Sequence, residues 1–125
     1  MSLSVDVFVL DEHGGRRLAE SPADGSDLAG FESWRTEVWG SPAVSSLGAR
    51  YFPTLATGDL VVAPDEVPDF LAECDLIRAN LHAIAPADGV RKPHQWYVAQ
   101  ISARLSNVRD AALRAQRIGG GVIVW

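Results

Sequence analysis

Apolar side chains at the start of the chain alternate with other residues. Valines occupy every second position from Val5 to Val9, the spacing at which side chains reach the same face of a β-strand. We therefore expect a strand over residues 3–10, and because both of its faces are partly apolar, we expect it inside a sheet. Residues 11–15 end in two glycines and predict a turn, since glycine accepts the backbone angles that tight turns require. Residues 16–19 are expected to return as a short second strand.

Two later stretches repeat their apolar residues at three- and four-residue steps, which places one apolar stripe along an α-helix. The first predicts a helix over residues 65–84, with acidic residues in its first turns, where the helix dipole favours them. A polar linker over residues 88–93 follows. The second stretch predicts a longer helix from about residue 93 to residue 118. Three glycines at 119–121 would end that helix, and the apolar residues 122–125 then predict a final strand.

The middle of the chain is less regular. A helix is expected over residues 28–38. Its buried face would carry Leu28, Phe31, Trp34 and Val38. A Ser-Pro pair predicts the start of a short helix over residues 42–47. Residues 50–55 and 59–63 flank a glycine-containing turn and are expected to form a hairpin, with Pro53 confining the first strand to an edge or a bulge.

These elements predict an α+β fold with a single globular domain over residues 1–125. We expect a two-layer sandwich, in which a mostly antiparallel sheet of four or five strands carries the two long helices on one face. The C-terminal strand is expected to insert in the sheet beside the strand at residues 3–10. Composition agrees, because 47% apolar and 22% charged residues are typical of globular domains.

Targeting signals and membrane spans are not evident in the sequence. Apolar runs stay far below the roughly 18 residues that a membrane-spanning helix needs. The first residues lack the basic segment that opens a signal peptide. Cys74 is the single cysteine, so no disulfide can form within the chain. We therefore expect a cytoplasmic protein that does not bind membranes.

Charge is distributed unevenly along the chain. The net charge is −5, but residues 1–75 hold 14 acidic residues and 4 arginines, whereas residues 76–125 hold 2 acidic and 7 basic residues. The first half includes a block of carboxylates without intervening cations. Its candidate partner-binding residues are Asp65, Glu66, Asp69 and Glu73. Such a block can steer a basic protein partner toward a docking surface, and it can equally cap a helix and form a solvated face.

Two tryptophans are candidate anchors of the same interface. Trp96 is predicted to lie on the outer side of the last helix, and Trp39 lies beside a predicted turn. Exposed tryptophans are typical of binding hot spots. Both side chains can also pack under the region of residues 11–50, so this alternative stays open.

An alternative ligand site is suggested by one ridge of the helix at residues 65–84. Cys74, Arg78 and His82 follow one another at four-residue steps, and a thiolate beside a cation could act as a nucleophile or a redox centre. Cys74 also lies at the centre of the apolar stripe, where burial raises the pKa of a thiol and makes it inert. We favour this second interpretation.

Other site classes find no support in the residue pattern. His13, His82 and His94 lack the spacing of metal ligands on a helix. The three glycines precede no helix that could bind a phosphate. The arginines of the last helix point in different directions, and the net negative charge opposes binding to nucleic acid. We expect no metal, no cofactor and no nucleic-acid partner.

The leading functional hypothesis is therefore a non-enzymatic module, of bacterial origin, that binds another protein. An inhibitor or immunity-type protein that masks a basic partner fits the size and the acidic charge. The alternative is a small-ligand-binding protein or a small enzyme, with a cleft between the 11–50 region and the helices and with Cys74, Arg78 and His82 as residues to test. A homodimer formed through Trp96 or through a sheet edge is compatible with both hypotheses.

Overall fold

The computed structural model describes residues 2–22, 25–87 and 92–125. Within these ranges the centre of the fold is one antiparallel sheet of five strands. The strands are β1 (Ser2–Leu10), β2 (Arg16–Leu18), β3 (Leu28–Phe31), β4 (Leu60–Val62) and β5 (Gly121–Val124). Their spatial order is β2-β1-β5-β4, and β3 also pairs with β1.

Strand β1 organises the sheet because it pairs on both of its edges. Along one edge it pairs with β5, with Val5 opposite Val124. The other edge is shared, since β2 pairs near the end of β1 and β3 near its start. The predicted short second strand is confirmed, and so is the insertion of the C-terminal strand beside β1. Strand β4 extends the sheet on the far side of β5.

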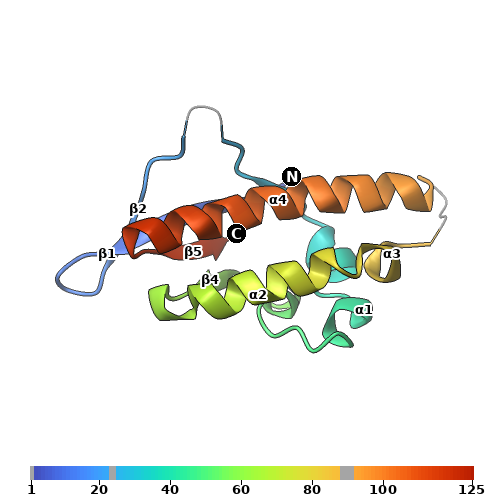
Figure 1. Ribbon diagram of the computed structural model, residues 1–125, viewed down its shortest axis with the longest axis horizontal. Helices are drawn as coiled ribbons and strands as arrows, with labels where there is room; N and C mark the ends of the chain where they lie inside the picture. The colour runs from blue at the N-terminus through green and yellow to red at the C-terminus, as the bar shows by residue number, and fades with distance from the viewer. Residues whose placement is uncertain (1, 23–24, 88–91) are drawn as a thin grey trace.

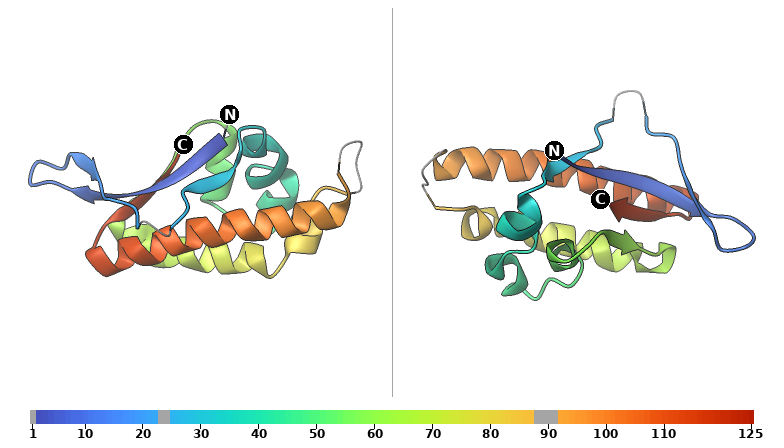
Figure 2. Two further views of the ribbon diagram at one scale, coloured as in Figure 1. Left: turned by 90° about the horizontal axis from the view of Figure 1, so that it is seen from above. Right: turned by 180° about the vertical axis from the view of Figure 1, so that it is seen from behind.

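Two long helices form the second layer. Helices α2 (Val67–Arg78) and α4 (His94–Ile118) cover the same face of the sheet (Figure 1; Figure 2, left). The side chains of β1 at positions 3, 5 and 7 belong to the core on this face and are almost completely buried. Apolar partners in this core include Val5, Val7, Val122, Val124, Ile101, Leu105 and Val108. The predicted α+β sandwich with two helices on one face of an antiparallel sheet is thus confirmed.

The last helix, its glycines and the final strand follow the prediction closely. Gly119 has a φ of 70°, the left-handed conformation that ends a helix, and the Gly120 N–H donates to the Ala115 carbonyl at 2.8 Å. The glycines also have a packing role that the sequence did not reveal. A methyl group added at Gly121 would overlap the Phe8 ring, so glycine lets β5 approach β1.

The helix predicted over residues 28–38 is wrong. Residues Leu28–Phe31 form strand β3, and a short π-helix, η1 (Arg35–Trp39), follows. Gly30 explains the difference, because its φ of 113° lies outside the helical region and any larger side chain there would collide with Trp34. The segment instead supplies the backbone partners that the first residues of β1 require.

The strand predicted over residues 50–55 is also wrong. Residues Phe52–Ala56 form a 3₁₀ helix, η2, with Pro53 in its first turn, where the missing N–H costs no hydrogen bond. The second half of the expected hairpin is confirmed as β4. The short helix at residues 42–47 is confirmed as α1 (Pro42–Ser45), whose N-cap Ser41 accepts a hydrogen bond from the Val44 N–H at 3.3 Å.

The helix predicted over residues 65–84 is real but interrupted. A 3₁₀ turn, η3 (Pro64–Glu66), precedes α2, and a short helix, α3 (Leu81–Ile84), follows it. The break lies at Asn80, whose φ of −127° is not helical and whose side-chain amide donates to the Leu76 carbonyl at 2.8 Å. Asparagine often competes in this way with backbone hydrogen bonds. The predicted linker at residues 88–93 falls mainly outside the described residues.

Candidate functional site

The sheet face that the long helices leave uncovered carries large apolar side chains at the surface. They are Leu10, Leu18, Leu28, Val61 and Trp125, each 41–50% exposed. We call these five residues the open face. Figure 2 (right) shows the strands of this side in front of the two long helices.

The register of the strands places the five side chains together. Residues directly opposite each other in antiparallel strands point to the same face. Leu18 lies opposite Phe8, and Leu28 lies opposite Ser4. Trp125 also belongs to this face, since Ser4 and Trp125 exchange two backbone hydrogen bonds of 2.8 and 3.0 Å.

Between the five exposed residues, the centre of the open face is filled by other side chains of β1 and β5. Val61 lies opposite Ile123, which in turn lies opposite Asp6. Ile123 and Phe8 are buried at 6% and 2% exposure, although neither belongs to the core cluster under the helices. The open face therefore has its own small apolar centre.

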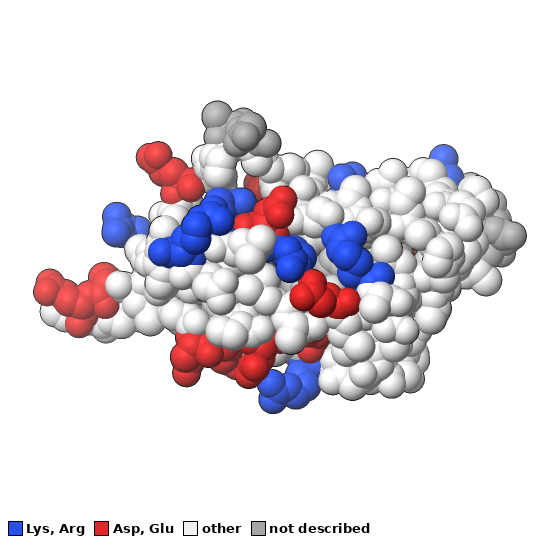
Figure 3. All heavy atoms as spheres, viewed as in Figure 1, with Lys and Arg blue, Asp and Glu red and all other residues white. Residues whose placement is uncertain are grey.

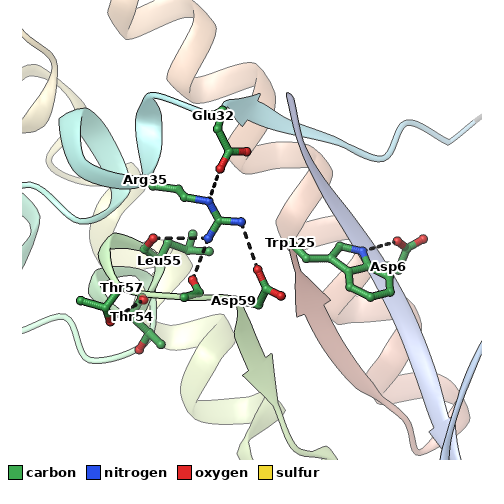
Figure 4. A network of polar contacts seen from close by, with 9 residues as sticks. Asp6, Glu32, Arg35, Thr54, Leu55, Thr57, Asp59 and Trp125 are labelled. Carbon is green, nitrogen blue, oxygen red and sulfur yellow. Dashed lines mark hydrogen bonds and ion pairs between the residues drawn. The ribbon is translucent and has the colours of Figure 1, made fainter. Parts of the chain in front are cut away.

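Polar contacts fix the largest side chain of the open face. The indole Nε1 of Trp125 donates to the Asp6 carboxylate at 2.9 Å (Figure 4). At the opposite end of the sheet, the Arg16 guanidinium lies over the Phe8 ring, 5.9 Å from its centroid. Because Arg16 is opposite Leu10, its side chain belongs to the same face. Arg16 therefore adds one positive charge to this end of the open face, beside the turn that carries Asp11 and Glu12.

At the other end of the open face, Arg35 forms a network of hydrogen bonds and ion pairs that the sequence did not suggest. Its guanidinium binds Glu32 at 2.6 Å and Asp59 at 3.0 Å, and it donates to the Gly58 carbonyl at 2.7 Å (Figure 4). Burial lowers the pKa of Arg35, but hydrogen bonds and charges from the two carboxylates outweigh that effect and raise it. Two carboxylates thus share one cation, so this end is net negative.

Glu73 has a structural role in place of the predicted role in partner binding. The residue is only 7% exposed. Its carboxylate accepts hydrogen bonds of 2.5–3.1 Å from the backbone N–H groups of Arg50, Tyr51 and Phe52. These groups begin η2 and would otherwise lack acceptors, so Glu73 belongs to the interior.

The other residues of the predicted acidic docking surface lie near the start of α2. Figure 3 shows acidic side chains gathered at this edge of the molecule. Glu66 accepts a hydrogen bond from the Ala63 N–H at 3.2 Å, and Asp69 lies 3.9 Å from Arg50. Asp65 lies in the turn before α2, and Asp69 is exposed. Binding of a basic partner through these residues stays a prediction.

The two tryptophans predicted as anchors have different environments. Trp39 is fully buried, donates from Nε1 to the Ala29 carbonyl at 2.9 Å and packs on Phe52, so it cannot contact a partner. This outcome matches the alternative of packing inside the 11–50 region. Trp96 is half-buried near the start of α4, edge-on to the Tyr97 ring.

Cys74, Arg78 and His82 do not converge on one site. Cys74 is fully buried, and burial raises the pKa of its thiol to about 12, so the thiol is inert as we favoured. Arg78 instead joins α2 to α4, donating to the hydroxyls of Ser102 and Ser106 at 3.1 and 2.7 Å. His82 is exposed, with its ring 5.7 Å from the ring of His94.

A cavity of about 610 Å³ lies between the β3–η1 segment and the start of α4. Its lining residues are Phe31, Ser33, Trp34, Glu37, Lys92, Trp96 and Tyr97. The cavity occupies the place where we expected a cleft, between the 11–50 region and the helices, but different residues form it. Of the predicted site residues it contains Trp96.

Metal ligands do not gather anywhere in the described ranges, where no three His, Cys, Asp or Glu side chains approach one another closely enough to hold an ion. The described helices all fall short of the length and apolar character needed to cross a bilayer. Neither a protein-family model, nor a curated protein, nor a solved structure matches this chain. The candidate sites therefore rest on the geometry of the chain itself.

Proposed function

We propose that this protein is a non-enzymatic protein-interaction module that binds through its open face. The observation that carries this proposal is the position of its exposed apolar side chains. Five of the eight large hydrophobic residues that are exposed in the described chain lie together on the uncovered side of the sheet. Several exposed apolar side chains on one face of a protein are typical of interaction sites.

The polar ends of the open face favour a second copy of this chain as the partner. Arg16 supplies a positive charge on the open face at one end, and the network of Glu32, Arg35 and Asp59 is net negative at the other end. A two-fold axis that lies in the plane of the interface, perpendicular to the line from Arg16 to Asp59, would place Arg16 of each copy beside Asp59 of the other. Opposite charges at the rim would then fix the orientation of two apolar centres.

The proposal is tested by measuring self-association with matched variants. Leu28→Glu and Val61→Glu introduce charge on the open face, whereas Leu76→Glu and Ile118→Glu introduce it at exposed apolar positions of the helices. Sedimentation velocity over a concentration series should show a dimer for the wild type and for both helix variants. The open-face variants should be monomers with an unchanged circular dichroism spectrum.

Two outcomes would contradict this proposal. A wild type that stays monomeric at millimolar concentration would exclude the second copy as the partner. A dimer that dissociates in the helix variants and persists in the open-face variants would move the interface to the helical side. Repeating the series at high salt separates the electrostatic and the apolar contributions to dimer affinity, because salt weakens the Arg16–Asp59 contacts far more than the apolar contacts.

A further inference from the structure

The cavity between β3, η1 and α4 has aromatic walls. Its volume of about 610 Å³ lies in the range of small-molecule sites, roughly 300–1,000 Å³. Four of its lining residues are aromatic. Trp34 stands edge-on to Phe31, with ring centroids 5.6 Å apart, and Trp96 stands edge-on to Tyr97 at 5.1 Å. The two edge-to-face pairs come from different elements, and because Trp34 is only 2% exposed, the accessible aromatic surface comes mainly from Phe31, Trp96 and Tyr97.

One aromatic wall of the cavity already holds a cation. The Lys92 ammonium lies 5.4 Å from the centroid of the Trp96 ring. The negative face of an indole ring attracts positive charge at this distance. The Trp96 ring therefore holds the Lys92 ammonium at the wall of the cavity, where it can meet a negative group of a ligand.

Two opposite charges line the cavity without neutralising each other. Glu37 and Lys92 both contribute to its wall and both are exposed. Within the described part of the chain, neither side chain forms an ion pair. A ligand that carries one positive and one negative group would complement both, whereas a ligand with a single charge would be repelled by one of them.

We propose that this cavity binds a small zwitterion of the betaine class, which carries a methylated ammonium group and a carboxylate. The methylated ammonium lies against the aromatic rings beside Glu37, and the carboxylate faces Lys92. Methylation matters because the apolar methyl groups pack against the aromatic rings while the positive charge faces Glu37, whereas a primary ammonium is more strongly hydrated. The proposal does not depend on the open face.

Three related probes test the ligand class by isothermal titration calorimetry. Glycine betaine carries both charges, choline lacks the carboxylate, and 3,3-dimethylbutanoate replaces the ammonium nitrogen by carbon at nearly the same shape. Glycine betaine should bind most tightly. Each of the other two should bind roughly tenfold more weakly, because each loses one electrostatic contact. Equal binding of 3,3-dimethylbutanoate, or no binding of glycine betaine at millimolar concentrations, would overturn the proposal.

Two variants test which cavity residue binds which charged group of the ligand. Glu37→Gln should weaken both glycine betaine and choline, whereas Lys92→Met should weaken glycine betaine and leave choline unchanged or tighter. Glu12→Gln, at an exposed position in the β1–β2 turn, is the matched control and should bind like the wild type. Circular dichroism verifies that each variant is folded. Undiminished binding of glycine betaine to both Glu37→Gln and Lys92→Met would refute the assignment of this cavity.

Discussion

The Glu73 carboxylate of α2 accepts a hydrogen bond from the Phe52 N–H at 2.8 Å, and in this way the helix holds the start of η2. The same carboxylate binds the N–H groups of the two preceding residues. A single side chain therefore ties the start of η2 to a helix more than 20 residues further along the chain. The Phe52 side chain is fully buried and stacks on Phe70, with ring centroids 5.3 Å apart.

Replacing this carboxylate should destabilise the fold. Glu73→Gln keeps the size of the side chain but loses the negative charge and one acceptor, so we expect a loss of about 1.5–3 kcal/mol in the free energy of unfolding. Urea denaturation followed by circular dichroism measures the loss. Asp69→Asn, at an exposed carboxylate of the same acidic block, is the control and should change stability by less than about 1 kcal/mol, the size of a helix-dipole contribution. Equal effects of the two substitutions would contradict the structural role of Glu73.

Gly30 should tolerate no side chain. Gly30→Ala forces an L-residue to a φ of 113° and places its methyl group against the Trp34 ring, so a loss well above about 1 kcal/mol is expected. Gly58→Ala is the matched control, because open space surrounds that glycine and its φ is not positive. Thermal unfolding of the two variants gives the comparison. A midpoint for Gly30→Ala at or above that of Gly58→Ala would mean that the β3 backbone is free to change.

The Cys74 thiol should react only after unfolding. Its pKa is raised by burial to about 12, and burial also blocks access, so a disulfide reagent at pH 8 should label the native protein at the rate of its unfolding. Labelling as fast as in urea would contradict this environment.

The raised pKa of the Cys74 thiol also makes the stability of the fold depend on pH. The thiol of the unfolded chain ionises near its ordinary pKa of 9.0 while the folded thiol stays neutral, so stability is complete below pH 9 and falls between pH 9 and about 12.

The pH dependence is measured by comparison with Cys74→Ala. The wild type should lose up to about 1.4 kcal/mol per pH unit more than the variant in that range, since the variant lacks the ionising group. Other groups that titrate at alkaline pH are common to both proteins and cancel in the difference. Parallel stability curves for the two proteins at about pH 9 to 11 would show that the thiol ionises equally well in the folded state.

The sequence predicted those elements whose signals are local. The apolar stripe of α4, the left-handed Gly119 and the apolar β5 stand next to one another in the chain, and each constrains its neighbour. The helix expected at residues 28–38 does not form, although Leu28, Phe31 and Trp34 have helical spacing. Gly30 has a φ outside the helical region, and Trp34 packs against it. At that position tertiary packing overrides the helical preference of the local sequence.

The candidate sites depend on contacts between distant residues, and a sequence pattern does not contain them. Glu73 looked like one carboxylate among several until its loop partners, more than 20 residues away, were known. The open face requires the strand register, since a shift of β2 by one residue would turn Leu18 to the opposite face of the sheet and bring its neighbours to the open face. The aromatic cavity joins residues 31–37 to residues 92–97. Only Trp96 gave a usable signal, as a tryptophan outside the apolar stripe of its helix.

The pairing of β1 with β5 also determines when the protein can finish folding. Val5 cannot pair with Val124 until residue 124 has left the ribosome, whereas β2 and β3, which pair with the other edge of β1, are made much earlier. Closing so long a loop is entropically costly and slow. During synthesis the edge of β1 that faces β5 therefore remains unpaired after its other edge can already be closed, and the sheet is completed last.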